Sequence, residues 1–141
     1  MASGNTHDLI TISQAVGAGM ATGSPVIVAG CLSGLVLSPD LDLPRCNARR
    51  RWRNVGLGWL WSPYARAIPH RSFWSHAPIV GTAGRLLYLG AMLSPLIVAT
   101  ISGLSMSFDP LISGSVAGLA LLFFAGLAVA DTGHWVADHL A

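Results

Sequence analysis

Long stretches without a single charged side chain constrain this chain more than any other feature of its sequence. Residues 9–39, 86–108 and 110–130 contain no Asp, Glu, Lys or Arg. The last two stretches are each long enough for one membrane-crossing helix, which needs roughly 20 apolar residues. Only 10% of the 141 residues are charged, against roughly a quarter in soluble domains. The sequence therefore predicts an integral membrane protein.

Turn signals divide these stretches into helices. Ser24-Pro25 is typical of an N-cap followed by proline at the first helical position, and Asp109-Pro110 predicts a turn. One long tilted helix over 9–39 is the alternative, because each half would be only roughly 21 Å long. We expect an all-α membrane bundle of about four helices in two hairpins, forming one domain over 1–141, with helices at about 9–22, 25–39, 79–106 and 110–140.

The segment 40–77 differs from the rest of the chain in its charged and aromatic residues. It holds seven of the eight arginines and four of the five tryptophans, namely Trp52, Trp59, Trp61 and Trp74. Arginine in a short loop marks the cytoplasmic side of a membrane, and tryptophan is enriched at headgroup depth. We expect an interfacial loop on the cytoplasmic face of a bacterial inner or thylakoid-type membrane. Its arginines would contact membrane lipids, and no nucleic-acid partner is expected.

Two hairpins would bring most of the His and Asp residues to that cytoplasmic face. These residues precede the first helix, follow the second, precede the third in the motif PHRSFWSH, and end the fourth. Imidazole and carboxylate groups are common ligands of divalent metals. The predicted metal ligands are His7, Asp8, Asp40, Asp42, His70, His76, His134 and Asp138.

Each of these motifs also has an ordinary structural explanation, as a helix end, a turn or a lipid anchor. Their convergence favours a metal site, with more ligands than one tetrahedral Zn²⁺ needs and enough for two ions. We expect one or two divalent ions, Zn²⁺ first, with Mn²⁺ and Mg²⁺ as alternatives. The candidate catalytic residues are Arg71, whose planar guanidinium suits phosphate, and Asp131, on one helical face with His134 and Asp138.

Several motifs resemble a known family. The segments SGNTHDLIT, LSPDLDL, PHRSFWSHAPIVGTAGRLLYL and HWVAD are similar to those of small cyanobacterial-type membrane proteins described as metal-binding (DUF2227-like). That family in turn resembles YdjM-like inner-membrane metal-dependent hydrolases, which share an HRxxxH-like segment and a late HxxxD helix. The resemblance covers roughly residues 3–90 and 131–140. It implies metal ligands at His7, Asp40 or Asp42, His70, His76, His134 and Asp138.

Two functions remain open at this point. The first is a metal-dependent hydrolase acting on a phosphoester at the cytoplasmic membrane surface, with the metal activating water. The second is a non-catalytic small subunit or assembly factor of a membrane protein complex, or a homo-oligomer, with a structural His/Asp metal site. Small residues in GLALLFFAGLAVA suit the helix contacts that the second function needs. The excess of candidate ligands favours the hydrolase.

Overall fold

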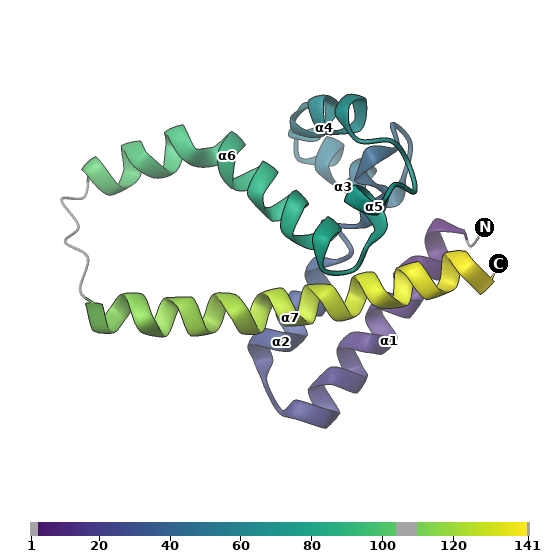
Figure 1. The fold of residues 1–141 in the computed structure, drawn as a ribbon, viewed down its shortest axis with the longest axis horizontal. Helices are drawn as coiled ribbons and strands as arrows, with labels where there is room; N and C mark the ends of the chain where they lie inside the picture. Colours follow the sequence, from purple (N-terminus) through teal and green to yellow (C-terminus); the bar gives the residue numbers. More distant parts are fainter. Residues whose placement is uncertain (1–2, 104–109, 141) are drawn as a thin grey trace.

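All regular secondary structure in the described part of the chain is helical, as the sequence predicts. The computed structural model describes residues 3–103 and 110–140, with the side chains of 3–100 and 115–140. Within these ranges there are seven α-helices, two 3-10 helices and no strand. Two long helices, α6 (Val80–Gly103) and α7 (Pro110–Leu140), extend away from an end where the short helices and both termini lie (Figure 1).

The first apolar stretch forms two helices, which confirms the predicted break. α1 (Gly4–Thr22) ends at Gly23, whose φ of 62° is a left-handed conformation that glycine adopts without steric cost. α2 (Pro25–Ser33) follows at once, because the Ser24 hydroxyl accepts a hydrogen bond from the Ile27 N–H and caps the helix.

The bounds of these helices differ from the expected 9–22 and 25–39. α1 starts at Gly4, because the Ser3 hydroxyl accepts from the Thr6 N–H at 3.2 Å and caps the helix earlier. α2 ends at Ser33, where the backbone changes to tighter bonds between residues three apart, such as those from the Leu35 and Val36 N–H groups to the Leu32 and Ser33 carbonyls. Pro39 then opens the next element.

The segment 40–77, expected as a loop, is folded into short helices. Ser38 caps the first of them and Cys46 caps the second by accepting from the Arg49 N–H. These elements are η1 (Pro39–Asp42), α3 (Asn47–Asn54), η2 (Gly58–Trp61), α4 (Ser62–Ala67) and α5 (Phe73–His76).

A small aromatic core holds this segment together. Trp61 is fully buried and packs edge-on against Tyr64, with ring centroids 5.7 Å apart. Leu41 and Leu60 belong to the same buried cluster. Trp61, expected at the membrane interface, therefore lies in the core instead, where a large aromatic ring buries much apolar surface.

α7 packs against both N-terminal helices through small residues. A Cβ atom added to Gly30 of α2 would meet the Phe123 carbonyl of α7, and one added to Gly126 of α7 would meet the Ile27 carbonyl of α2. The two backbones are therefore in direct contact, as at other small-residue helix crossings. On α1, the Gln14 amide donates to the Val129 carbonyl of α7 at 2.7 Å.

Near its start α6 contacts α7 through Thr82 and Arg85, which both bond to Asp131, and α6 then bends away (Figure 1). The bend lies in a helix that contains Pro95, which has no N–H and therefore leaves the Ala91 carbonyl without its helical donor. The Ser94 hydroxyl donates to that carbonyl at 2.8 Å instead. The predicted end of this helix at 104–106 and the predicted turn at Asp109 lie outside the described residues.

Replacing Gly126 with alanine should destabilise the fold. The new methyl group would press on the Ile27 carbonyl, and overpacking of this kind costs about 1–3 kcal/mol. Gly118→Ala is the matched control on the same helix, because its Cβ would meet nothing within 4 Å. We expect thermal unfolding in detergent to show a lower midpoint for Gly126→Ala only. Equal midpoints for the two variants would contradict the direct α2–α7 contact.

Candidate metal centre

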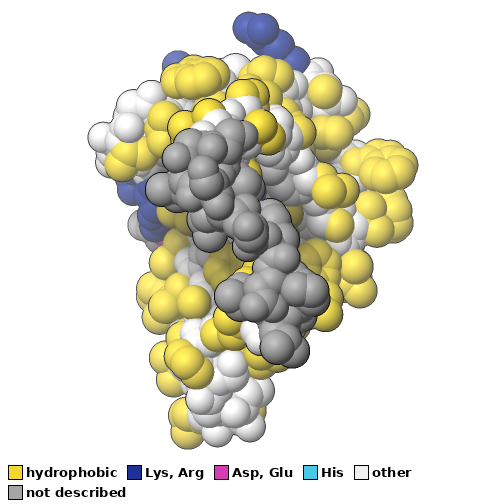
Figure 2. Space-filling model, turned by 90° about the vertical axis from the view of Figure 1, so that its left-hand side faces the viewer, with side chains coloured by type: hydrophobic (Ala, Val, Ile, Leu, Met, Phe, Trp, Pro, Cys, Tyr) yellow, Lys and Arg dark blue, Asp and Glu magenta, His cyan; other side chains and the backbone are white. Residues whose placement is uncertain are grey.

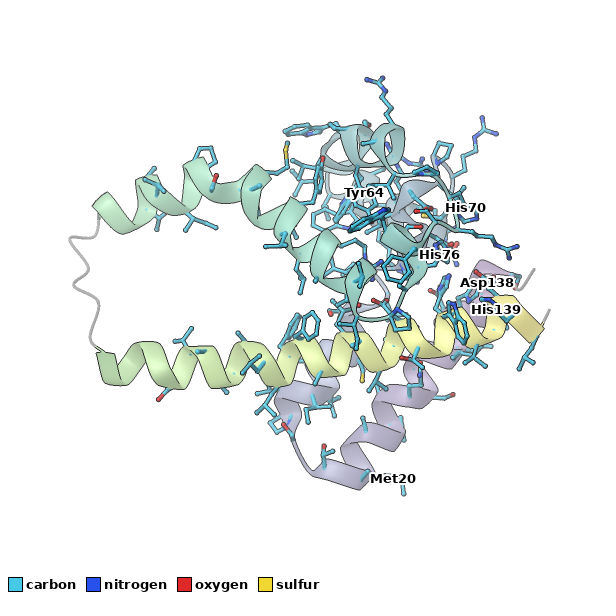
Figure 3. The ribbon with its side chains drawn as sticks, viewed as in Figure 1. Met20, Tyr64, His70, His76, Asp138 and His139 are labelled. Carbon is cyan, nitrogen blue, oxygen red and sulfur yellow. The ribbon has the colours of Figure 1, made fainter. Side chains whose placement is uncertain are left out.

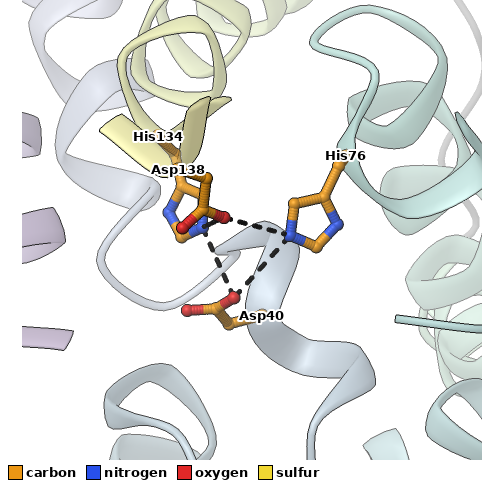
Figure 4. A group of neighbouring side chains, drawn as sticks. All are labelled: Asp40, His76, His134 and Asp138. Carbon is orange, nitrogen blue, oxygen red and sulfur yellow. Dashed lines mark ion pairs between the residues drawn. The ribbon is translucent and has the colours of Figure 1, made fainter. Parts of the chain in front are cut away.

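Four side chains from three separate segments meet at the end of the molecule that holds both termini. Asp40 comes from η1, His76 from α5, and His134 and Asp138 from the last turns of α7 (Figure 4). Each residue offers one ligand atom, and these four atoms all lie within 4.8 Å of one another. We call these four residues the four-ligand group.

The spacing of the ligand atoms suits a shared cation. The Nε2 atom of His134 lies 3.4 Å from Asp40 Oδ1 and 3.6 Å from Asp138 Oδ2. The Nε2 atom of His76 lies 3.8 Å and 3.7 Å from the same two oxygens. These separations are long for hydrogen bonds. Two ligands of one tetrahedral ion, each about 2.0–2.2 Å from it, are about 3.3–3.6 Å apart.

The charge and burial of the group point the same way. His76 and His134 are buried, and among the described residues their Nε2 atoms have no hydrogen-bond partner. A buried ring nitrogen without a partner is costly unless something else binds its lone pair. Two carboxylates with two neutral imidazoles supply two negative charges, which match one divalent cation.

Asp42, His70 and His76 form a second group, which shares His76 with the first. Asp42 Oδ1 is 2.9 Å from His70 Nδ1, and Asp42 Oδ2 is 3.8 Å from His76 Nδ1. These three side chains also come close enough to hold an ion. Asp42 can also act without binding a metal itself. Its hydrogen bond to His70 Nδ1 orients the His70 ring and leaves the His70 Nε2 atom free as a ligand.

Ser75 also orients His76 and was missed in the sequence. Its hydroxyl oxygen lies 2.8 Å from His76 Nδ1, on the side of the ring opposite the four-ligand group. Ser75 is fully buried. A serine directly before a candidate ligand histidine is too common a pattern to single it out without the fold.

His7 lies beside the four-ligand group without belonging to it. Its ring stacks on His134 with centroids 3.7 Å apart and an interplanar angle of 12°, and its Nε2 lies 3.4 Å from Asp138 Oδ1. Burial, together with the neighbouring His134, lowers the pKa of His7 below its ordinary value. A neutral His7 can therefore hold the His134 ring in place by stacking on it, or bind the metal as a further ligand.

The electrostatic environment keeps Asp40 ionised. Burial alone would raise the pKa of this carboxyl, but the imidazoles of His134 and His76 outweigh burial and hold its pKa well below the usual range. An ionised carboxylate is the form that a cation binds.

Two residues predicted for the site are engaged elsewhere. Asp8 accepts from both terminal nitrogens of Arg51, at 3.1 and 2.7 Å, and from the Asn47 amide at 2.9 Å. Asp131 is buried away from the four-ligand group and accepts from Arg85 and Thr82. Arg85 also donates to the Ser75 carbonyl at 2.8 Å, so this buried pair ties α7 to α6 and to the segment that carries His76.

A pocket of about 420 Å³ opens beside the four-ligand group. His76 and Asp138 lie in its wall, together with Arg71, and Figure 3 shows His70, His76 and Asp138 at this same end of the molecule. The Arg71 guanidinium is 3.3 Å from Asp138 Oδ1 and its side chain is 45% exposed. The pocket therefore joins a candidate cation site to a partly exposed guanidinium.

Metal content is the direct test of this centre. We expect protein purified in mild detergent without chelator to carry at least one divalent ion per chain by elemental mass spectrometry. His134→Ala should lose that ion, whereas His139→Ala should keep it, because His139 belongs to neither ligand group. Adding the metal should also raise the thermal midpoint of the wild type and not that of His134→Ala. Identical metal content in the two variants would exclude the four-ligand group.

Asp131 should affect stability rather than metal content. Asp131→Ala leaves the Arg85 guanidinium buried without its carboxylate, which costs about 3–5 kcal/mol in comparable buried pairs. The double variant Arg85→Met/Asp131→Leu should recover much of the lost thermal midpoint and bind metal as the wild type does. Loss of metal from a stably folded Asp131 variant would instead place this carboxylate in the metal centre.

The comparison with protein families agrees with this geometry. No curated protein and no solved structure matches the chain. The model of one family, described as uncharacterized metal-binding protein (DUF2227), matches residues 2–141. Because the match covers nearly the whole chain, including every residue of the four-ligand group, the chain belongs to the DUF2227 family of metal-binding proteins.

Proposed function

We propose that this protein is a metal-dependent hydrolase that acts on a phosphoester at a membrane surface. The observation that carries the proposal is the pocket, in which two members of the four-ligand group share a wall with Arg71. A structural metal site is closed by four protein ligands, whereas a catalytic ion also binds water. With the four protein ligands present here, that water would be a fifth ligand on the side of the pocket. The pocket gives water and substrate access to that side.

The backbone of Arg71 supports a functional role for its side chain. Arg71 has a φ of 59°, and it is the one non-glycine residue with positive φ in the described part of the chain. Glycine adopts this conformation without the steric cost that any side chain incurs. Strained residues of this kind cluster at functional sites, so the backbone of Arg71 supports a role for its guanidinium in binding.

The residues around the pocket divide the work of phosphoester hydrolysis. Asp40, His76, His134 and Asp138 would hold the cation, which when bound polarises a phosphoryl oxygen and activates water. The Arg71 guanidinium would bind the phosphate oxygens in a bidentate manner. Water supplies the new P–O bond, the ester P–O bond breaks, and the products are an alcohol, which takes a proton from the water, and inorganic phosphate.

The donor set favours Zn²⁺ over Mg²⁺. Two of the four ligand atoms are imidazole nitrogens, which suit Zn²⁺, whereas Mg²⁺ prefers oxygen ligands and bound water. Asp42 and His70 could hold a second ion with His76, at the expense of the hydrogen bond between them.

α6 and α7 are the candidate membrane spans. Val80–Thr100 and Ser115–Leu140 are long and apolar enough to cross a bilayer, and only 11% and 22% of their most apolar windows are buried within the chain. Figure 2 shows hydrophobic side chains predominating among the described residues on the face seen from the far end of these helices. We infer that both helices cross the membrane and that the metal centre lies at the cytoplasmic surface, beside the arginine-rich helix α3.

Arg71→Gly provides a sharp test of this function. Glycine suits the backbone at this position, so the variant should unfold at the same or a higher temperature than the wild type. We expect Zn²⁺- or Mn²⁺-dependent release of phosphate from p-nitrophenyl phosphate, with kcat/KM reduced about 100-fold in Arg71→Gly, as for loss of a charge-assisted contact. Arg66→Ala, an exposed arginine on α4, should keep full activity.

Two outcomes would count against the hydrolase. Metal binding without phosphoester hydrolysis would favour the alternative, a small subunit of a membrane complex with a structural metal site. Equal activity of wild type and Arg71→Gly would remove Arg71 from substrate binding, whatever reaction the metal centre performs.

A further inference from the structure

The pocket beside the four-ligand group has two chemically different walls. Arg71, His76 and Asp138 form a polar wall, whereas Phe73 and Trp135 contribute aromatic surface. Phe73 is 66% exposed and Trp135 is 40% exposed. Neither ring is needed to fill the buried core, so both are available to a ligand.

Exposed apolar residues also neighbour the pocket residues along the chain. Trp74 of α5, Ile79 just before α6 and Leu140 at the end of α7 are exposed to 64%, 66% and 84%. Exposed apolar side chains near a pocket suit a site that binds a membrane or an apolar ligand.

The position of the pocket fixes how a ligand would lie in it. A phosphate held by Arg71 and the four-ligand group would sit at the ends of the spans, which is headgroup depth if α6 and α7 cross the bilayer. A hydrocarbon chain attached to that phosphate could pass over Phe73 and Trp135 towards the apolar surface of the spans.

We propose that the substrate of this pocket is an amphiphile, a phosphate ester of a long hydrocarbon chain of the kind found in lipid phosphates. This inference rests on the proposed hydrolase function and adds its substrate class. Arg71 and the metal centre recognise the phosphate, and Phe73 and Trp135 recognise the first part of the chain.

Binding of two phosphonates tests the inference without depending on turnover. Dodecylphosphonate and methylphosphonate share the head group and differ in the chain, and their P–C bonds resist hydrolysis. Each is titrated into metal-loaded protein in a neutral maltoside detergent and followed by calorimetry. We expect dodecylphosphonate to bind at least tenfold more tightly, because its chain leaves water for the aromatic wall.

Variants separate the pocket from unspecific partition into the micelle. Phe73→Ala/Trp135→Ala should lose the preference for the long chain and keep its affinity for methylphosphonate. Trp135→Leu, which stays apolar, should retain most of the preference. Trp59→Ala removes a tryptophan that is 62% exposed and lies outside this pocket, and it should bind both ligands as the wild type does.

The outcomes distinguish the two levels of the proposal. Equal affinities for the two phosphonates, or a preference that survives in Phe73→Ala/Trp135→Ala, would overturn the amphiphilic substrate and leave the phosphoester hydrolase standing. Failure of metal-loaded protein to bind either phosphonate would overturn the hydrolase itself.

Discussion

Two carboxylates and two imidazoles crowded within 4.8 Å are the arrangement around which the rest of this molecule is organised. Without a cation, the Asp40 and Asp138 carboxylates repel each other and the ring nitrogens have nothing to bind. The surrounding structure must therefore hold each side chain in place. α7 supplies two ligands one helical turn apart, η1 supplies one from a short helix capped by Ser38, and α5 supplies one from a single helical turn.

The buried Arg85–Asp131 pair is the main support for that arrangement outside the ligands themselves. Asp131 lies on α7 one turn before His134, and Arg85 lies on α6 and donates to the Ser75 carbonyl, next to His76. One ion pair thus sets the distance between the helix that carries two ligands and the segment that carries a third. The Arg85 guanidinium has donors in several fixed directions, so one side chain reaches both the Asp131 carboxylate and the Ser75 carbonyl.

Periodic and local features of the fold could be read from the sequence, and long-range ones could not. The break at Ser24-Pro25 follows from capping chemistry, and all-helical structure follows from the uncharged stretches. The gathering of His and Asp residues followed from helix direction alone. The roles of Asp8 and Asp131 depend on Arg51 and Arg85, which lie 43 and 46 residues away and whose pairing leaves no local pattern. The burial of Trp61 likewise depends on tertiary packing.

The packing of the first helices against the last one has a consequence for the order of assembly. The hydrogen bond from Gln14 to Val129 joins residues 115 positions apart, and α2 meets α7 through Gly30 and Gly126. During synthesis, α1 and α2 emerge long before their partner exists and must wait without it. The metal centre likewise needs His134 and Asp138 of α7 together with Asp40 and His76. Metal capture therefore waits until α7 has been made, and a bound ion would report that α7 has docked correctly.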